Sequence, residues 1–106
     1  MHPIIHHPEK SKFALVEDGI EAQITYTIRD SRVILLHTIV PDQLAGRGIA
    51  SRLAHHVLSF LKKEQIRAVV RCPFILHYLR KHPEHQSVID AAYSRQYKQL
   101  HGGESS

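Results

Sequence analysis

Alternating hydrophobic and polar positions predict a sheet in the first part of the chain. Residues 21–28 alternate without exception, which is typical of a half-buried strand. The apolar side of this segment consists of Ala22, Ile24, Tyr26 and Ile28. A short apolar run at residues 13–16 precedes it, and the intervening Asp18-Gly19 favours a hairpin.

A longer apolar run and a helical repeat follow. Residues 33–40 read VILLHTIV and end at Pro41, which predicts a central strand covered on both faces. From Gly46 onward the period becomes helical, and its apolar stripe is expected to pack on the sheet. Residues 66–72 alternate again, so strand, helix and strand form one right-handed parallel unit. The stripe comprises Ile49, Ala50, Leu53, Ala54, Val57, Leu58 and Leu61.

Two further helices are predicted after the last strand. Pro73 suits the first position of a helix, which puts Cys72 at or near its N-cap. The apolar residues of this short helix are Phe74, Leu76, Tyr78 and Leu79. A last amphipathic helix is expected from about residue 86 to residue 100, where apolar residues recur at steps of three and four.

The two ends of the chain carry weaker patterns. Residues 1–12 are polar and rich in histidine and proline, so we expect a loose lead-in with at most one edge segment near Ile4. Residues 101–106 are expected to be a disordered tail. Residues 13–100 form one predicted domain of the α/β (α+β) class, with a mixed, mostly antiparallel sheet in the order β-β-β-α-β-α-α.

Composition fits a folded domain. The chain has 106 residues, of which 42% are hydrophobic and 23% are charged, a balance typical of globular proteins. Because no apolar run has the length of a membrane span or a signal peptide, we expect an intracellular, cytoplasmic location. A single cysteine, Cys72, excludes an internal disulfide and fits a reducing compartment.

Charge narrows the classes of partner. A formal net charge of +4 and a pI near 9.5 favour anionic partners, including nucleic acids, anionic membranes and phosphate-bearing small molecules. The basic residues are spread along the chain without interleaved aromatic residues, which disfavours a nucleic-acid interface. The adjacent pairs His6-His7 and His55-His56 lack the spacing of metal ligands, so we predict no metal site.

Two glycines lie between a predicted strand and a predicted helix. Gln43, Gly46 and Gly48 form the pattern Q-x-x-G-x-G. Free amides in the first turn of a helix bind anions, and glycine lets a ligand approach the backbone closely. Such a loop also occurs where glycine is needed for its backbone angles alone. Arg47 and Arg52 lie beside it and favour a diphosphate.

The stretch HTIVPDQLAGRGIASRL, followed after one helix and one strand by VRCPFILHYLRKHPEH, resembles the small GCN5-related N-acetyltransferase-like proteins. Within them it is most similar to the subgroup with a cysteine near the acetyl group. The resemblance covers roughly residues 13–85. It implies the minimal fold of that family, with acetyl-CoA bound by the glycine-containing loop and its pantetheine between strands 33–40 and 66–72. The motif residues are Gln43, Gly46 and Gly48, then Cys72-Pro73-Phe74, Tyr78 and His82-Pro83-Glu84.

The resemblance also implies which residues contact acetyl-CoA and what they do with it. The expected reaction transfers the acetyl group to an unidentified amine, aliphatic or macromolecular, that approaches an open site. The expected cofactor-binding residues are Thr38, Ile39, Val40, Gln43, Leu44, Ala45, Gly46, Arg47, Gly48, Ile49, Ala50, Arg52, Cys72 and Phe74.

Three residues are candidates for the chemistry, each with a structural alternative. Cys72 is either a buried thiol or, as the resemblance implies, the carrier of the acetyl group; thiols at helix N-termini carry more of the nucleophilic thiolate. Tyr78 is either a core residue or the proton donor to the departing CoA thiolate. His37 is either a core histidine or a base. Ile39 stands where relatives often carry glutamate, so His37 or a water would have to accept the proton of the amine.

Two other functions remain open on the sequence alone. The missing carboxylate at Ile39 is consistent with a CoA-binding module of little catalytic activity, which tight CoA binding with slow turnover would reveal. The basic charge is consistent with a nucleic-acid-binding domain, which steep salt dependence without a thermal shift from CoA would reveal.

Overall fold

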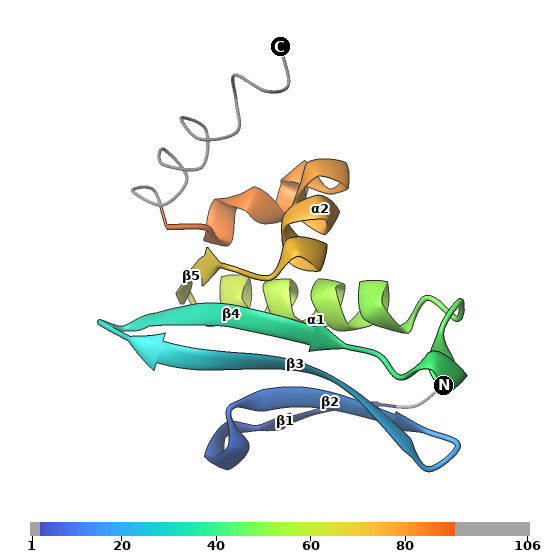
Figure 1. Ribbon diagram of the computed structural model, residues 1–106. Coiled ribbons are helices and arrows are strands. Elements are labelled where there is room, and N and C mark those ends of the chain that lie inside the picture. Colours follow the sequence, from blue (N-terminus) through green and yellow to red (C-terminus); the bar gives the residue numbers. More distant parts are fainter. Residues whose placement is uncertain (1–2, 91–106) are drawn as a thin grey trace.

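A five-stranded sheet forms the centre of the molecule, and the computed structural model describes residues 3–90 of the chain. The strand order follows the sequence, from β1 to β5 (Figure 1). The first four strands pair antiparallel, whereas β4 and β5 pair in parallel, as predicted for a mixed, mostly antiparallel sheet. The strands are β1 (Ile4–His7), β2 (Lys12–Glu17), β3 (Ile20–Arg29), β4 (Arg32–Ile39) and β5 (Arg67–Val70).

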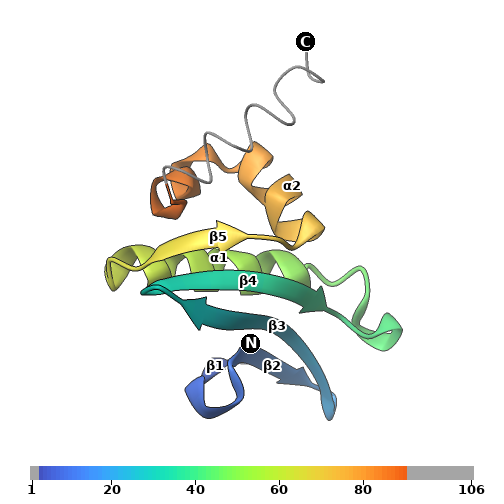
Figure 2. The same cartoon turned by 60° about the vertical axis from the view of Figure 1, so that its left-hand side comes forward.

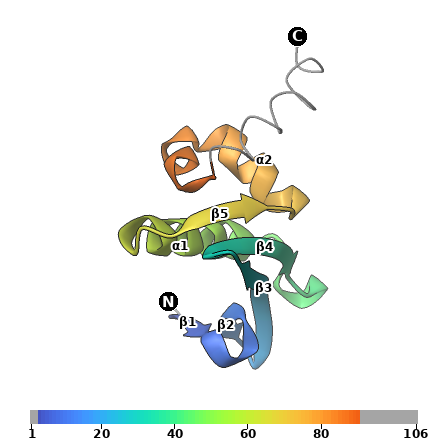
Figure 3. The ribbon, with the colours of Figure 1, turned by 90° about the vertical axis from the view of Figure 1, so that its left-hand side faces the viewer.

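Helix α1 (Ile49–Lys63) connects β4 to β5 in the chain and crosses one face of the sheet (Figure 2). Helix α2 (Pro73–Lys81) follows β5. In Figure 3, α1 lies below β5 and α2 lies above it. Three short 3-10 segments complete the described chain: η1 (Pro8–Lys10), η2 (Asp42–Leu44) and η3 (Pro83–Val88). The segment η3 packs on both α1 and α2. Within residues 3–90, no helix is long and apolar enough to cross a membrane.

The core forms where the predicted stripe of α1 meets the sheet. Alternating side chains of β2 and β3 point toward the helix, because successive residues of a strand face opposite sides. Phe13, Leu15 and Ile24 are at most 1% exposed. On the helix, the buried residues are Ile49, Leu53, Ala54, Val57, Leu58 and Leu61. The periodicity of the sequence therefore identified the packing face of α1 correctly.

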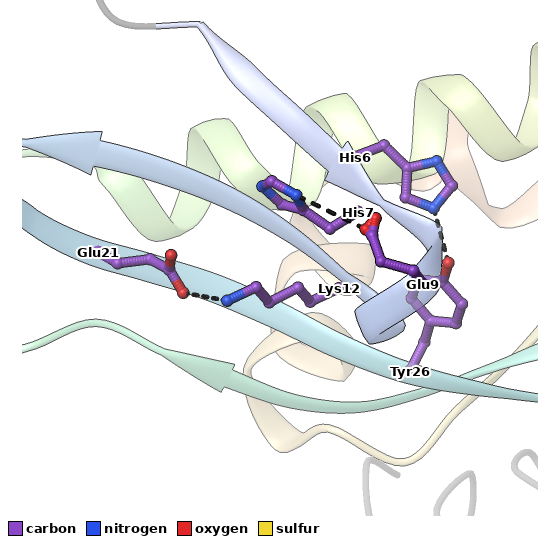
Figure 4. Close-up of polar contacts among 6 residues, drawn as sticks. All are labelled: His6, His7, Glu9, Lys12, Glu21 and Tyr26. Atoms are coloured by element: carbon purple, nitrogen blue, oxygen red, sulfur yellow. Dashed lines mark hydrogen bonds and ion pairs between the residues drawn. The ribbon is translucent and has the colours of Figure 1, made fainter.

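The N-terminal segment contributes an edge strand to the sheet, as predicted near Ile4. The edge segment near Ile4 is a strand, β1, which pairs with β2 along its length. His6 stacks on Phe13 with 4.1 Å between ring centroids. Its Nε2 lies 2.6 Å from the Tyr26 hydroxyl, a contact drawn in Figure 4. In β1, the imidazole of His6 packs in the position where an apolar side chain would be expected. The strand therefore lacks the hydrophobic–polar alternation that would have predicted it.

Two other predictions about elements need correction. The apolar run of β4 is not covered on both faces: Val33 and Leu35 are buried, but Ile39 is 44% exposed, because α1 covers only one side of the sheet. No α-helix begins near residue 86, since η3 continues to Val88 and Ile89 then forms a parallel bridge with Ala68. The rest of that predicted helix lies outside the described residues.

Candidate functional site

Strands β4 and β5 separate at their C-terminal ends. Their parallel ladder pairs Leu35 with Val70, and the Arg71 amide still donates to the Leu35 carbonyl at 2.9 Å. Beyond this point β4 continues to Ile39 beside β3, whereas the chain after β5 turns into α2. The C-terminal ends of parallel strands are where open α/β sheets bind ligands. The separation therefore marks the first place to look for a site.

A bulge in β4 decides which side chains face this separation. Tyr26 lies opposite Leu35 and Thr25 opposite His37, so Leu36 is an extra residue in the ladder. One extra residue reverses the alternation that follows it. Thr38 thus pairs opposite the buried Ile24, and His37 and Ile39 lie on the exposed side.

Because His37 is exposed, its alternative interpretation as a buried core histidine is wrong. Its predicted catalytic role does not depend on burial and stays a prediction. The side chain lies at the same end of β4 as the separation, where a group arriving from solvent would meet it.

The structure brings two of the predicted site residues into contact. Cys72 Sγ lies 3.1 Å from Thr38 Oγ1, within hydrogen-bond distance, and the two residues come from opposite sides of the separation. Cys72 is 3% exposed and is the N-cap of α2, where its carbonyl accepts a hydrogen bond from the Leu76 amide at 3.1 Å. A thiol and a hydroxyl therefore meet where the parallel strands part.

The loop of residues 43–48, called the glycine loop below, begins within η2 and leads into α1. Gly46 and Gly48 have φ of 79° and 73°, and Gly48 is the N-cap of α1. A Cβ atom added at either glycine would meet no heavy atom within 4 Å. The backbone angles therefore need glycine, and the loop faces open space; anion binding at the loop stays a prediction. The amides of residues 49–51 begin the helix, where such groups have no intrahelical acceptor, so this backbone fits an anion.

The side chains around the glycine loop divide into buried anchors and exposed groups. Leu44 is fully buried and Ile49 is 2% exposed, so only their backbones are available to a ligand. Gln43 and Ala45 are exposed. Val40, Ala50 and Phe74, the other predicted binding residues, are half-buried. A ligand at this loop would therefore meet mostly main chain.

The two arginines near the loop have different surroundings. Arg47 Nη1 lies 2.8 Å from Glu17 Oε2 and 2.9 Å from Asp18 Oδ2, which ties the glycine loop to the turn between β2 and β3. These hydrogen bonds raise the pKa of Arg47. Contact with a phosphate would require other N–H groups of Arg47 or an exchange of partners. Arg52 lines a hollow of about 630 Å³ beside α1, together with His55, His56 and Lys63.

Tyr78 belongs to a ring cluster between α1, α2 and η3 that the sequence did not reveal. Its ring stacks on His82 at 4.1 Å and lies 5.9 Å from the ring of His85. His85 Nε2 is 3.2 Å from His55 Nδ1. Burial, with a smaller effect of Glu84, raises the pKa of Tyr78. Only the spacing of Tyr78 and His82, which is one helical turn, could have suggested part of this cluster.

The histidines of this ring cluster were candidates for metal binding. Burial and the neighbouring His55 lower the pKa of His85, which favours the neutral imidazole. Across residues 3–90, no group of three or more His, Cys, Asp or Glu side chains is placed to hold a metal ion. His55 and His85 form a contact between α1 and η3.

Comparisons with known proteins agree with one another. A family model described as GCN5-related N-acetyl-transferase matches residues 12–88. Protein NATD1 of Xenopus tropicalis is 41% identical over 81 residues, which are 74% of each chain. Protein NATD1 of Bos taurus is 35% identical over 81 residues, 74% of this chain and 72% of that protein. The NMR structure of a GCN5-like protein from Staphylococcus aureus aligns with a TM-score of 0.66 at 27% identity, covering 83% of this chain and 87% of the other.

Proposed function

Because the chain belongs to the GCN5-related N-acetyltransferase family, we propose that it binds acetyl-CoA at the separation of β4 and β5 and transfers the acetyl group to an amine. One observation carries the proposal. The open glycine loop and the contact between Thr38 and Cys72 both lie at the C-terminal ends of the parallel strands. One elongated ligand with an anionic end and a reactive end would fit this arrangement.

The anionic end belongs at the glycine loop. The amides of residues 49–51 and the positive end of the α1 dipole would hold the pyrophosphate. Arg52, in the first turn of α1, adds positive charge nearby. The pantetheine would run between β4 and β5 beside Thr38, Ile39 and Val40. The open space at Gly46 and Gly48 supports this assignment, because a side chain at either position would fill it.

The reactive end belongs at Cys72, as in the family subgroup with a cysteine near the acetyl group. The Cys72 sulfur attacks the acetyl carbonyl carbon, and the bond from that carbon to the CoA sulfur breaks. The proton that Cys72 gives up ends on the CoA sulfur. The amine nitrogen then attacks the acetyl carbon of acetyl-Cys72, the bond from that carbon to the Cys72 sulfur breaks, and the proton that the amine loses restores the thiol. Because one thioester replaces another, the first transfer is nearly isoenergetic.

Two residues are proposed for the proton transfers. His37 lies exposed at the end of β4 and would accept the proton of the amine. Tyr78 would relay the proton from Cys72 to the departing CoA sulfur, donating its own hydroxyl proton and taking up the one that Cys72 gives up. Burial raises the pKa of this phenol. Its ring contacts hold it among His82, His85 and Phe74. The acceptor amine is proposed to be aliphatic or part of a macromolecule, since the exposed side of β4 leaves the approach open.

A second candidate function is CoA binding with little transfer. The observation that favours it is Ile39, which is 44% exposed beside His37 and supplies no carboxylate to an incoming ammonium group. Tight CoA binding together with slow acetylation of every amine tested would establish this alternative.

Intact-protein mass spectrometry after incubation with acetyl-CoA tests the transfer. We expect the mass of one acetyl group to be added to the wild-type chain and to be absent from Cys72→Ala. Calorimetric titration of both proteins with CoA should give binding in each, because the glycine loop is unchanged. An unmodified wild-type chain that still acetylates an amine would show that Cys72 is not a carrier.

A further inference from the structure

We propose that Thr38 is a positioning residue for Cys72, and that the bulge at Leu36 exists in β4 to aim the Thr38 hydroxyl at the Cys72 sulfur. The inference rests on the proposed function, since it assigns a role within the same site. It concerns the Thr38 side chain, whereas the binding role suggested above involves only the strand's contact with pantetheine.

The bulge makes the contact possible. Without the extra residue, strict alternation from Val33 and Leu35 would place His37 and Ile39 on the α1 side and turn Thr38 to the exposed side. The observed register instead sets Thr38 opposite Ile24, which is fully buried. Bulges commonly lie beside active sites, where they redirect a side chain. Here the redirected side chain ends 3.1 Å from Sγ.

The position of Cys72 leaves its sulfur available for this contact. Cys72 is the N-cap residue of α2, yet its side chain does not cap the helix. The Thr38 hydroxyl is the hydrogen-bond partner that the structure gives the sulfur. A hydroxyl has a single proton to donate, and a thiolate accepts such a bond more strongly than a thiol does. Thr38 thereby fixes the direction of the sulfur, and its hydroxyl can donate to the sulfur as it attacks.

Thr38→Val and Thr38→Ser form the matched pair that tests this role. Valine keeps the branched shape of threonine and removes only the hydroxyl, whereas serine keeps the hydroxyl. We expect acetyl-Cys72 to form roughly tenfold more slowly in Thr38→Val, the loss that removal of one hydrogen bond to a charged group produces. Thr38→Ser should react at close to the wild-type rate. The affinity for CoA, measured by calorimetry, should be the same in all three proteins.

Alkylation of Cys72 by iodoacetamide at neutral pH gives a readout that needs no CoA. The rate should fall in Thr38→Val and recover in Thr38→Ser, with the three melting temperatures measured alongside. Equal alkylation rates in all three proteins would overturn the role of Thr38. Equal slowing in the valine and serine variants would also overturn it, since packing rather than the hydroxyl would then be responsible. Absence of CoA binding in the wild type would instead contradict the proposed function, while the alkylation rates still decide the role of Thr38.

Discussion

At the scale of single residues, the glycines show how one position serves conformation and binding together. Gly48 has a φ of 73° and caps α1, and the space beside its α-carbon is open. Gly19, in the turn between β2 and β3, has nearly the same φ, 74°, and equally open surroundings. The two positions therefore carry the same backbone strain on substitution, but only Gly48 lies at the proposed pyrophosphate site.

Gly48→Val and Gly19→Val are a matched test of the glycine loop. Each substitution should cost roughly 1–2 kcal/mol of unfolding free energy or somewhat more, because an L residue is strained at positive φ. Only Gly48→Val should also lose the rise in melting temperature caused by CoA, since its side chain fills the space near the amides. A full CoA-induced shift in Gly48→Val would rule the loop out as the anion site.

At the scale of elements, a contact between histidines holds η3 on α1. His85 is 5% exposed, and its Nε2 lies 3.2 Å from Nδ1 of His55, within hydrogen-bond distance. One proton can therefore lie between the two nitrogens. Burial and His55 lower the pKa of His85. A histidine with a lowered pKa stabilises the fold while it is neutral. That stabilisation is complete above the unfolded pKa of about 6.5 and is lost as the pH falls below it.

Stability should therefore decrease in mild acid through this contact. We expect the melting temperature to fall between about pH 7 and pH 5, and to fall less steeply in His85→Gln, whose amide can still contact His55. A residual slope remains, because burial also lowers the pKa of His6 and of His56. His77→Gln replaces an exposed histidine of α2 and is the control. Identical slopes in His85→Gln and the wild type would exclude His85 as the source.

At the scale of the whole molecule, basic residues are spread along the chain, and one helix, α1, carries three of them with no acidic side chain. Between residues 49 and 63 the chain has no acidic side chain, and Arg52, Lys62 and Lys63 occupy this stretch together with two histidines. The hollow beside α1 is lined from this stretch and from Ile4 of β1. Such a surface attracts anions of several kinds, so charge alone does not separate CoA from nucleic acid.

Thermal shift and salt dependence distinguish CoA binding from nucleic-acid binding. CoA should raise the melting temperature, because a ligand that binds only the folded state stabilises it. Binding of RNA or duplex DNA should be weak at physiological salt. A nucleic-acid affinity that falls steeply with salt, together with no shift from CoA, would reverse the assignment in favour of a nucleic-acid-binding domain.

Local patterns in the sequence were enough for most of the elements. Alternation located β3, the helical period identified the buried side of α1, and Pro73 marked the start of α2. These features depend on neighbours along the chain, so they can be read from it directly. The spacing of Gly46 and Gly48 likewise indicated the loop that the structure leaves open. In β1, a polar residue, His6, packs against Phe13, so this strand shows no hydrophobic–polar alternation in the sequence.

The sequence by itself thus determined most of the elements and the residue types of the proposed site. Only the tertiary structure decided which side chains meet. Thr38 and Cys72 are 34 positions apart, and His55 and His85 are 30 apart. Their contacts depend on the register between strands and on how helices pack. A single extra residue, Leu36, exchanges the sides of His37 and Thr38. No local pattern records that exchange, because a bulge is fixed by the pairing of two strands and not by either strand alone.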